Sequence, residues 1–134
     1  MNTTAQIRTA LAAALSAEFS SDWNISPYLL ASPNPPQIEI VSGPVDYDLA
    51  MGRGLDLIRY IVRALVQHGS DLSGQVNLDS LLDGSSASGM KAVLEADKTL
   101  GGVVEDLRVT EASELKVYPQ GDFIGIEWIV ELYP

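Results

Sequence analysis

The sequence predicts a single α+β domain across residues 1–134, with a mixed or antiparallel sheet of about four to five strands and helices packed on one face. Three observations lead to this prediction. Residues 4–20 place apolar side chains at helical spacing, whereas residues 123–133 alternate them at strand spacing. A chain of 134 residues is also the length of one domain, which buries roughly two-thirds of its unfolded surface.

The first predicted helix spans residues 4–20, after a Thr3-x-x-Gln6 pattern that fits a capping box. One apolar stripe runs along it: Ile7, Leu11, Leu15 and Phe19. The N-terminal residues lack the charged start and cleavage pattern of a signal peptide. We therefore expect them to be part of the fold.

The proline-rich residues 32–36 predict an extended connector that leads into a short strand at residues 37–41. Residues 42–54 then read as an exposed loop. Residues 55–68 fit either a strand or a helix by periodicity. Their β-branched and aromatic content favours a strand.

The second half of the chain begins with a predicted helix at residues 70–82, with Ser70 as its cap. A short helix follows, capped by Ser85 or Ser86 and ended by the glycines of the 98–102 segment, which accept a positive φ. An extended run then points three side chains to one side: Val103, Leu107 and Val109. A polar loop at 111–114, a short segment at 115–118 and the long strand at 123–133 complete the order.

Two segments are candidates for contact with other proteins. The predicted 42–54 loop carries large side chains that either contact a partner or tuck back onto the core: Tyr47, Leu49, Met51 and Arg53. The 123–133 strand has bulky side chains on both faces, so it is either central in the sheet or meets another subunit. Its candidate interface residues are Phe123, Ile129 and Tyr133.

The charge balance of 8 basic and 18 acidic residues, a net −10, opposes binding to nucleic acid or anionic lipid. Solubility is the simpler reason for the acidity, and composition alone favours it. No apolar run reaches the ~20 residues of a membrane span. The absence of cysteine excludes disulfides and thiolate chemistry and favours synthesis in the cytoplasm.

No arrangement of residues predicts catalysis, a cofactor or a metal site. His68 is the only histidine, and we expect it to be structural. The acidic pairs, such as Asp46 with Asp48, lack the spacing of a calcium loop and are expected by chance in so acidic a chain. Gly101-Gly102 ends a helix and lies in no phosphate-binding motif.

Three stretches resemble one protein family. Residues 78–84 read LDSLLDG, residues 88–104 read SGMKAVLEADKTLGGVV, and residues 121–131 read GDFIGIEWIVE. Together they resemble the tail-terminator (tail-completion or neck-region) proteins of long-tailed bacteriophages. The D-x-T-L-G-G core at residues 97–102 is the distinctive part, and the order of elements agrees along most of the chain.

The resemblance implies a structural virion protein without enzymatic activity, assembled in the host cytoplasm. It would form a ring, typically a hexamer, on the tail tube. Its partners would be copies of itself, the major tail tube protein and a head-completion or connector protein. A hexamer would carry 6 × −10 = −60 formal charges. An acidic lumen would let DNA pass without specific binding.

Other functions remain open at this point. Within virion assembly, the chain could instead be a head-closure, other neck or minor tail protein. A soluble acidic adaptor that works as a monomer is an alternative from another class. The least favoured alternative is a small enzyme that uses Asp46 and Asp48.

Overall fold

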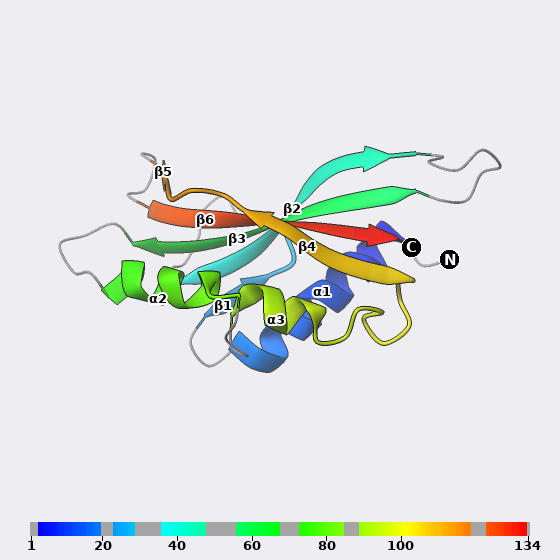
Figure 1. The fold of residues 1–134 in the computed structure, drawn as a ribbon, viewed down its shortest axis with the longest axis horizontal. Helices are drawn as coiled ribbons and strands as arrows, with labels where there is room; N and C mark the ends of the chain where they lie inside the picture. Colours follow the sequence, from blue (N-terminus) through cyan, green and yellow to red (C-terminus); the bar gives the residue numbers. More distant parts are fainter. Residues whose placement is uncertain are drawn as a thin grey trace.

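A computed structural model describes residues 3–19, 23–28, 36–47, 56–67, 73–84, 89–118 and 123–133 (Figure 1). Three helices and six strands follow one another along these residues. They are α1 (Thr4–Phe19), β1 (Asn24–Ser26), β2 (Gln37–Asp46), β3 (Leu57–Gln67), α2 (Ser73–Leu82), α3 (Met90–Glu95), β4 (Asp106–Ala112), β5 (Lys116–Tyr118) and β6 (Phe123–Tyr133). The predicted α+β class is confirmed.

The six strands form one mixed sheet in the order β1-β2-β3-β6-β4, with β5 also paired to β6. Only β1 runs parallel to its neighbour, β2; the β2–β3, β3–β6, β4–β6 and β5–β6 pairs are antiparallel. The sheet has more strands than expected because β1, in a stretch predicted to be irregular, pairs with the start of β2. Strand β6 lies between β3 and β4, which agrees with one of the two alternatives left open for it, a central strand.

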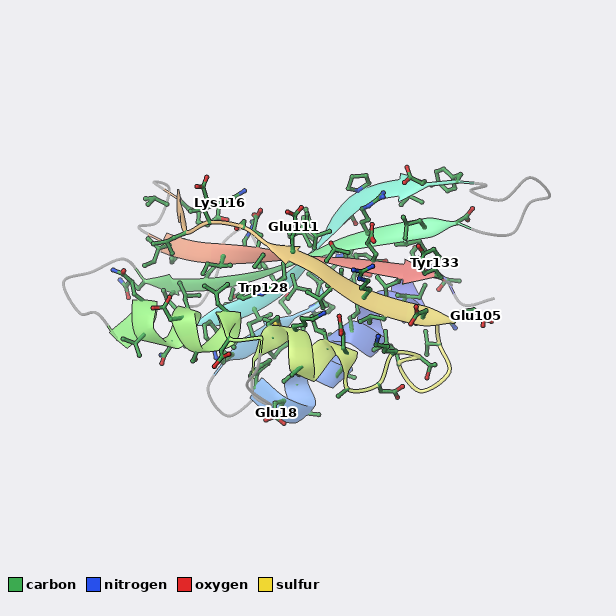
Figure 2. All side chains as sticks on the ribbon, viewed as in Figure 1. Glu18, Glu105, Glu111, Lys116, Trp128 and Tyr133 are labelled. Carbon is green, nitrogen blue, oxygen red and sulfur yellow. The ribbon has the colours of Figure 1, made fainter. Side chains whose placement is uncertain are left out.

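The three helices lie on the same face of the sheet (Figure 1). Side chains from these helices and from alternate strand positions form one core beneath them. Trp128, 3% exposed, points from β6 toward the helices (Figure 2). Since side chains alternate along a strand, the residues between the core positions point to the opposite face.

Helix α1 begins with the predicted capping box. The backbone N–H of Thr3 donates to Gln6 Oε1 at 2.7 Å, and the N–H of Gln6 donates to Thr3 Oγ1 at 3.2 Å. Its predicted apolar stripe is buried. Arg8 is also buried, and its guanidinium donates to the carbonyl oxygens of Pro27 at 2.9 Å and Ile40 at 2.8 Å and to Ser42 Oγ.

Strand β2 is longer than predicted, because it continues through Gly43 and Pro44 to Asp46. The prediction of a loop at residues 42–54 is therefore wrong for residues 42–46, which belong to β2. Pairing with β3 extends the strand, with a register shift between Ser42 and Val45. A Cβ at Gly43 would lie 2.9 Å from the carbonyl oxygen of Arg59, so this close approach requires glycine.

The ambiguous 55–68 segment is a strand, β3 (Leu57–Gln67), which pairs with β2 on one side and with β6 on the other. Helix α2 covers much of the predicted 70–82 segment, although its expected cap, Ser70, lies outside the described residues. His68 lies outside them too.

Helix α3 is shorter than predicted, and Gly89 is its N-cap residue without a side-chain cap. The expected caps Ser85 and Ser86 lie outside the described residues. The helix ends at Glu95, because an Asp97-centred turn competes with further helical hydrogen bonds.

Val103, expected in the next strand, lies in this turn. Strand β4 instead runs from Asp106 to Ala112, so the polar loop predicted from residue 111 starts later. A register shift between Val109 and Glu111 lets β4 stay paired with β6.

Candidate protein interface on the helix-free face of the sheet

Among the described residues, no helix covers the second face of the sheet (Figure 1). We call it the helix-free face, and its centre is formed by β3 and β6. Three cross-strand pairs define that centre by register: Arg59 opposite Glu131, Ile61 opposite Ile129, and Arg63 opposite Glu127. Glu111 and Lys116 also point away from the helices (Figure 2). Two rows of ion pairs therefore flank a row of aliphatic side chains.

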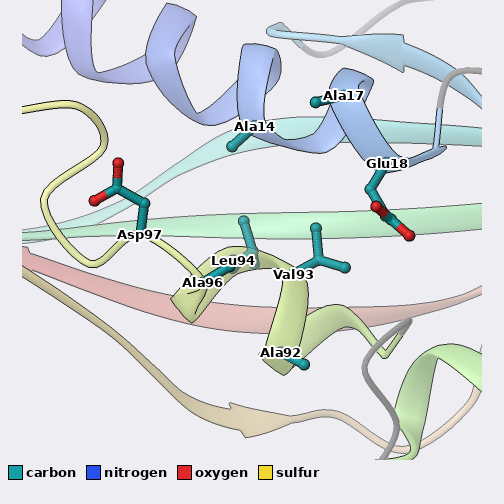
Figure 3. A pocket seen from close by; sticks show the side chains of 8 residues that line it. All are labelled: Ala14, Ala17, Glu18, Ala92, Val93, Leu94, Ala96 and Asp97. Carbon is teal, nitrogen blue, oxygen red and sulfur yellow. The ribbon is translucent and has the colours of Figure 1, made fainter.

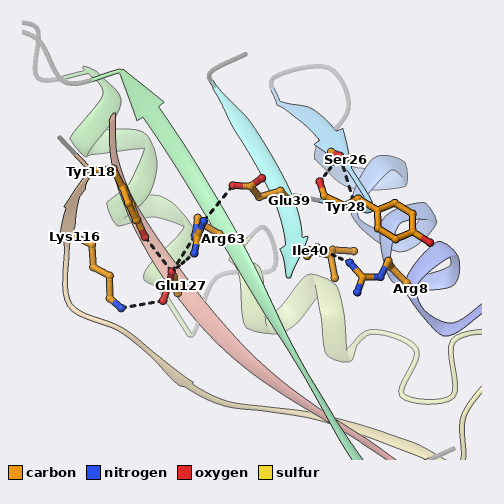
Figure 4. A network of polar contacts seen from close by, with 9 residues as sticks. All are labelled: Arg8, Ser26, Tyr28, Glu39, Ile40, Arg63, Lys116, Tyr118 and Glu127. Atoms are coloured by element: carbon orange, nitrogen blue, oxygen red, sulfur yellow. Dashed lines mark hydrogen bonds and ion pairs between the residues drawn. The ribbon is translucent and has the colours of Figure 1, made fainter. Parts of the chain in front are cut away.

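Glu127 is the centre of the first charged row (Figure 4). Its Oε2 lies 2.8 Å from Arg63 Nη2 and accepts from the Tyr118 hydroxyl at 3.0 Å, while Oε1 accepts from Lys116 Nζ at 2.9 Å. Burial alone would raise the pKa of this carboxyl. The hydrogen bonds from Lys116, Arg63 and Tyr118 outweigh burial, so the pKa lies below its ordinary value.

Tyr118 covers the arginine of this row. Its ring centroid lies 5.1 Å from Arg63 Cζ, a cation–π contact. Burial, followed by the negative charge of Glu127, raises the pKa of Tyr118 to about 12, although Arg63 opposes the change. The phenol is therefore neutral at physiological pH, and its hydroxyl donates a hydrogen bond to Glu127. Gly125 is required mainly by β3, since a Cβ there would lie 2.5 Å from the Ala64 carbonyl oxygen; it would also crowd Tyr118 Cε2 at 3.3 Å.

Arg59 joins the second charged row to the neighbouring strand. Its Nη1 lies 2.8 Å from Asp46 Oδ2 and its Nε lies 3.1 Å from Glu131 Oε2. In the first row, Arg63 has a third partner, because its Nη1 lies 3.5 Å from the buried carboxylate of Glu39. Charges alternate in sign across the strands, so each row is internally paired.

A hollow of about 170 Å³ lies over the aliphatic row. Ile61 and Ile129 form its floor, both half-buried. Its walls are polar: Glu111, Ser113, Lys116 and Glu127. Ser113 holds the bend between β4 and β5, since its N–H donates to the Glu127 carbonyl oxygen at 2.7 Å and its hydroxyl accepts the Glu127 N–H at 3.0 Å. An apolar floor between paired charges is suited to a protein contact.

The structure places the predicted interface residues in two regions. Tyr47 is 73% exposed and follows β2 at the end of an arm, formed by residues 42–47 and 56–60, that extends beyond the helices (Figure 1). Leu49, Met51 and Arg53 lie outside the described residues. The three candidates on β6 alternate along the helix-free face and are half-buried: Phe123, Ile129 and Tyr133.

Sequence reasoning missed the charged residues of the helix-free face. Arg59 and Arg63 are four residues apart on one strand, as are Glu127 and Glu131 on the other. Spacing by an even number shows that each pair shares a face. The pairing of β3 with β6, which the sequence does not state, brings the two sets together.

The 97–102 turn, which carries the resemblance to tail terminators, has a definite geometry. Asp97 Oδ1 accepts from the Thr99 N–H at 3.1 Å and from the Thr99 hydroxyl at 2.8 Å, and Oδ2 accepts the Gly101 N–H at 2.9 Å. These bonds lower the pKa of the Asp97 carboxyl. The φ angles of Leu100, Gly101 and Gly102 are 50°, 71° and 93°. The aspartate, the threonine and both glycines thus each have a structural role here.

A second hollow, of about 260 Å³, lies between α1 and α3 (Figure 3). Small side chains line much of it, including Ala14, Ala17 and Ala92. Glu18 and Asp97 lie at its rim, and Asp97 is already occupied by the turn. The hollow therefore offers few polar groups that could bind or orient a ligand.

The described part of the chain contains neither a metal-binding group of side chains nor a membrane-spanning helix. Its acidic side chains form no group of three or more that could hold a metal ion. None of its helices is long and apolar enough to cross a membrane.

The fold and this face together define an α+β domain with an open, ion-paired sheet surface. No protein-family profile matches the sequence. No curated protein matches it. One similar solved chain belongs to a structure described as "Virion of native gene transfer agent (GTA) particle", with 8% identity over 92% of this chain and 82% of that chain and a TM-score of 0.42. So weak a likeness establishes no function.

Proposed function

We propose that the chain is a structural virion protein that forms a ring, a hexamer in the simplest case, at the head-proximal end of a phage tail. There it ends growth of the tail tube and offers a surface for joining the head. The proposal assigns it no catalysis and no cofactor. Its partners are copies of itself, the tail tube protein and a head-completion protein, and DNA passes through without specific binding.

The observation that carries this proposal is the 97–102 turn. The D-x-T-L-G-G residues resemble the tail-terminator family, and three of them meet a physical requirement of this turn: Asp97 accepts three hydrogen bonds, and Gly101 and Gly102 have positive φ. The same letters without such geometry would be a coincidence of composition. The turn therefore supports the resemblance as a structural one.

The exposed surfaces are compatible with assembly. A ring requires two different surfaces that meet head to tail. The arm carries Tyr47, 73% exposed, beyond the body of the domain, and aromatic residues are enriched among interface anchors. An arm that reaches outward supplies one of the two surfaces.

The test is deletion of the gene from its phage. We expect tails of uncontrolled length that are separate from filled heads, as seen by electron microscopy. A plasmid copy of the wild-type gene should restore normal particles, whereas Tyr47→Ala should restore them poorly. Val76→Ala, at a residue 62% exposed on α2, is the matched control and should complement fully. Tails of normal length joined to heads in the deletion strain would disprove the role.

A further inference from the structure

The centre of the helix-free face has a pattern of charge that is complementary to itself. Along β3 the side chains on this face read positive, aliphatic, positive: Arg59, Ile61 and Arg63. Along β6, in register with them, they read negative, aliphatic, negative: Glu131, Ile129 and Glu127. Of these two strands, β3 supplies both cations and β6 both anions.

This pattern has a geometric consequence. A second copy turned by 180° about an axis parallel to these strands, midway between them, lays its β6 over β3 and its β3 over β6. Each arginine then faces a glutamate in both charged rows, and Ile61 faces Ile129 between them. The same surface thus meets itself with opposite charges opposed, as a two-fold interface requires.

We propose that the unassembled chain forms a two-fold dimer through this face, with a second copy of itself as the occupant. Two sheets pack face to face about 10 Å apart, with strands near parallel. The hollow of about 170 Å³ over Ile61 and Ile129 receives the aliphatic side chains of the partner. Because every charge of the two rows is already paired within its own chain, closing the dimer leaves none of them buried alone.

The side chains at the centre are accessible enough to make this contact. The exposed fractions of the Arg59 and Glu131 side chains are 24% and 23%. The dimer goes beyond the proposed ring, because it concerns the chain before it meets other virion proteins. Its consequence is that a half-apolar surface stays covered until assembly.

The test uses two variants that reverse one charge each, Arg59→Glu and Glu131→Arg. The first leaves only acidic side chains in its row of β3 and β6, and the second leaves only basic ones. Each variant alone should therefore dimerise at least tenfold more weakly than wild type, since like charges face one another. An equimolar mixture should dimerise again, because an all-acidic row then faces an all-basic one. Sedimentation velocity of the purified chains measures all three.

Matched controls carry the same charge changes elsewhere. Lys98→Glu, in the turn after α3, matches Arg59→Glu, and Glu18→Arg, on α1, matches Glu131→Arg; both residues are exposed. The controls should dimerise like wild type. A monomeric wild type, controls that dissociate like the test variants, or a mixture that stays monomeric would each overturn the proposal.

A second measurement does not depend on the charge variants folding normally. The chain contains no cysteine. Ile61→Cys and Ile129→Cys should be linked into a dimer by a short bismaleimide when they are mixed, because facing Cα atoms about 10 Å apart are beyond the reach of a direct disulfide, whereas each variant alone should cross-link much less. Equal cross-linking in all three samples, or none, would disprove the two-fold geometry. Neither experiment involves tails, so this failure and a failure of the ring proposal are distinguishable.

Discussion

Glu95, on α3, accepts the backbone N–H of Val109 on the edge strand β4 at 2.9 Å. Lys91, one helical turn earlier, pairs with Glu95 at 2.6 Å and donates to the carbonyl oxygen of Val109 at 3.4 Å. Two side chains of a short helix thus bond both backbone groups of an edge residue. This arrangement satisfies groups that would otherwise be open to pairing with another strand.

We predict that Glu95→Ala lowers the free energy of unfolding by about 1–2 kcal/mol, because it removes the acceptor of the Val109 N–H and the partner of Lys91. Urea denaturation measures the change. Lys98→Ala, at an exposed neighbouring residue, is the control and should have little effect. Equal stability of wild type and Glu95→Ala would show that α3 does not hold this edge.

Stability should fall in acid. Burial would raise the pKa values of Glu95 and Glu127, but hydrogen bonds to each carboxylate lower both below their ordinary value of 4.5. A depressed folded-state pKa contributes stability above the unfolded pKa, and this contribution is lost as pH falls through the folded one. We therefore expect the urea midpoint to decrease below about pH 4.5. In Glu127→Gln the decrease should be shallower, and an unchanged slope would exclude Glu127 as a source.

Replacing Arg8 should lower the free energy of unfolding more than removing Glu95 or either glycine of the 97–102 turn. Its guanidinium bonds two carbonyl oxygens and Ser42 Oγ, and it lies 4.5 Å from the Tyr28 ring centroid. Arg8→Met keeps the aliphatic stem but leaves these acceptors unpaired, so we expect a loss of roughly 2–4 kcal/mol in thermal or urea unfolding. Thr9→Ala, exposed on the same helix, should be nearly neutral. If Arg8→Met lowered the free energy of unfolding less than Thr9→Ala does, water would have replaced the hydrogen bonds of the guanidinium.

The glycines of the 97–102 turn provide a test of backbone conformation alone. A Cβ at Gly101 or Gly102 would contact nothing within 4 Å, but both residues have positive φ. Alanine at either position should therefore cost about 1–2 kcal/mol through strain, without a clash. Gly84→Ala is the matched control, since Gly84 also has open space around it but no positive φ. A similar stability for all three variants would contradict the strain argument.

Elements with a strong local pattern were predicted well from the sequence. The stripe of α1 and the alternation of β6 both follow from spacing within one segment, and both are present. Strand β1 was missed because three residues are too short for a periodic signal, and only pairing with β2 defines it. Residues 42–54 were expected to be a loop, yet Pro44 lies within β2. At this point no described strand pairs with β2 on the side away from β3, so a proline without an N–H is tolerated.

The candidate interface was predicted only in part. Strand β6 is central, one of the two alternatives that its bulky side chains left open. Tyr47 is exposed, as its interpretation as a partner contact requires, and that contact stays a prediction. The ion pairs of Arg59 with Glu131 and of Arg63 with Glu127 could not be predicted, because these partners are 72 and 64 residues away in sequence. No pattern within either strand specifies which distant strand it will pair with.

The sequence by itself determined the α+β class, the helix and strand periods and the glycine turn at residues 97–102, because these depend on neighbours a few positions apart. Tertiary structure alone decided that cations of β3 face anions of β6, since strand pairing and register arise from burial of the core face by all three helices together. One residue of slippage between β3 and β6 would abolish every one of these pairs.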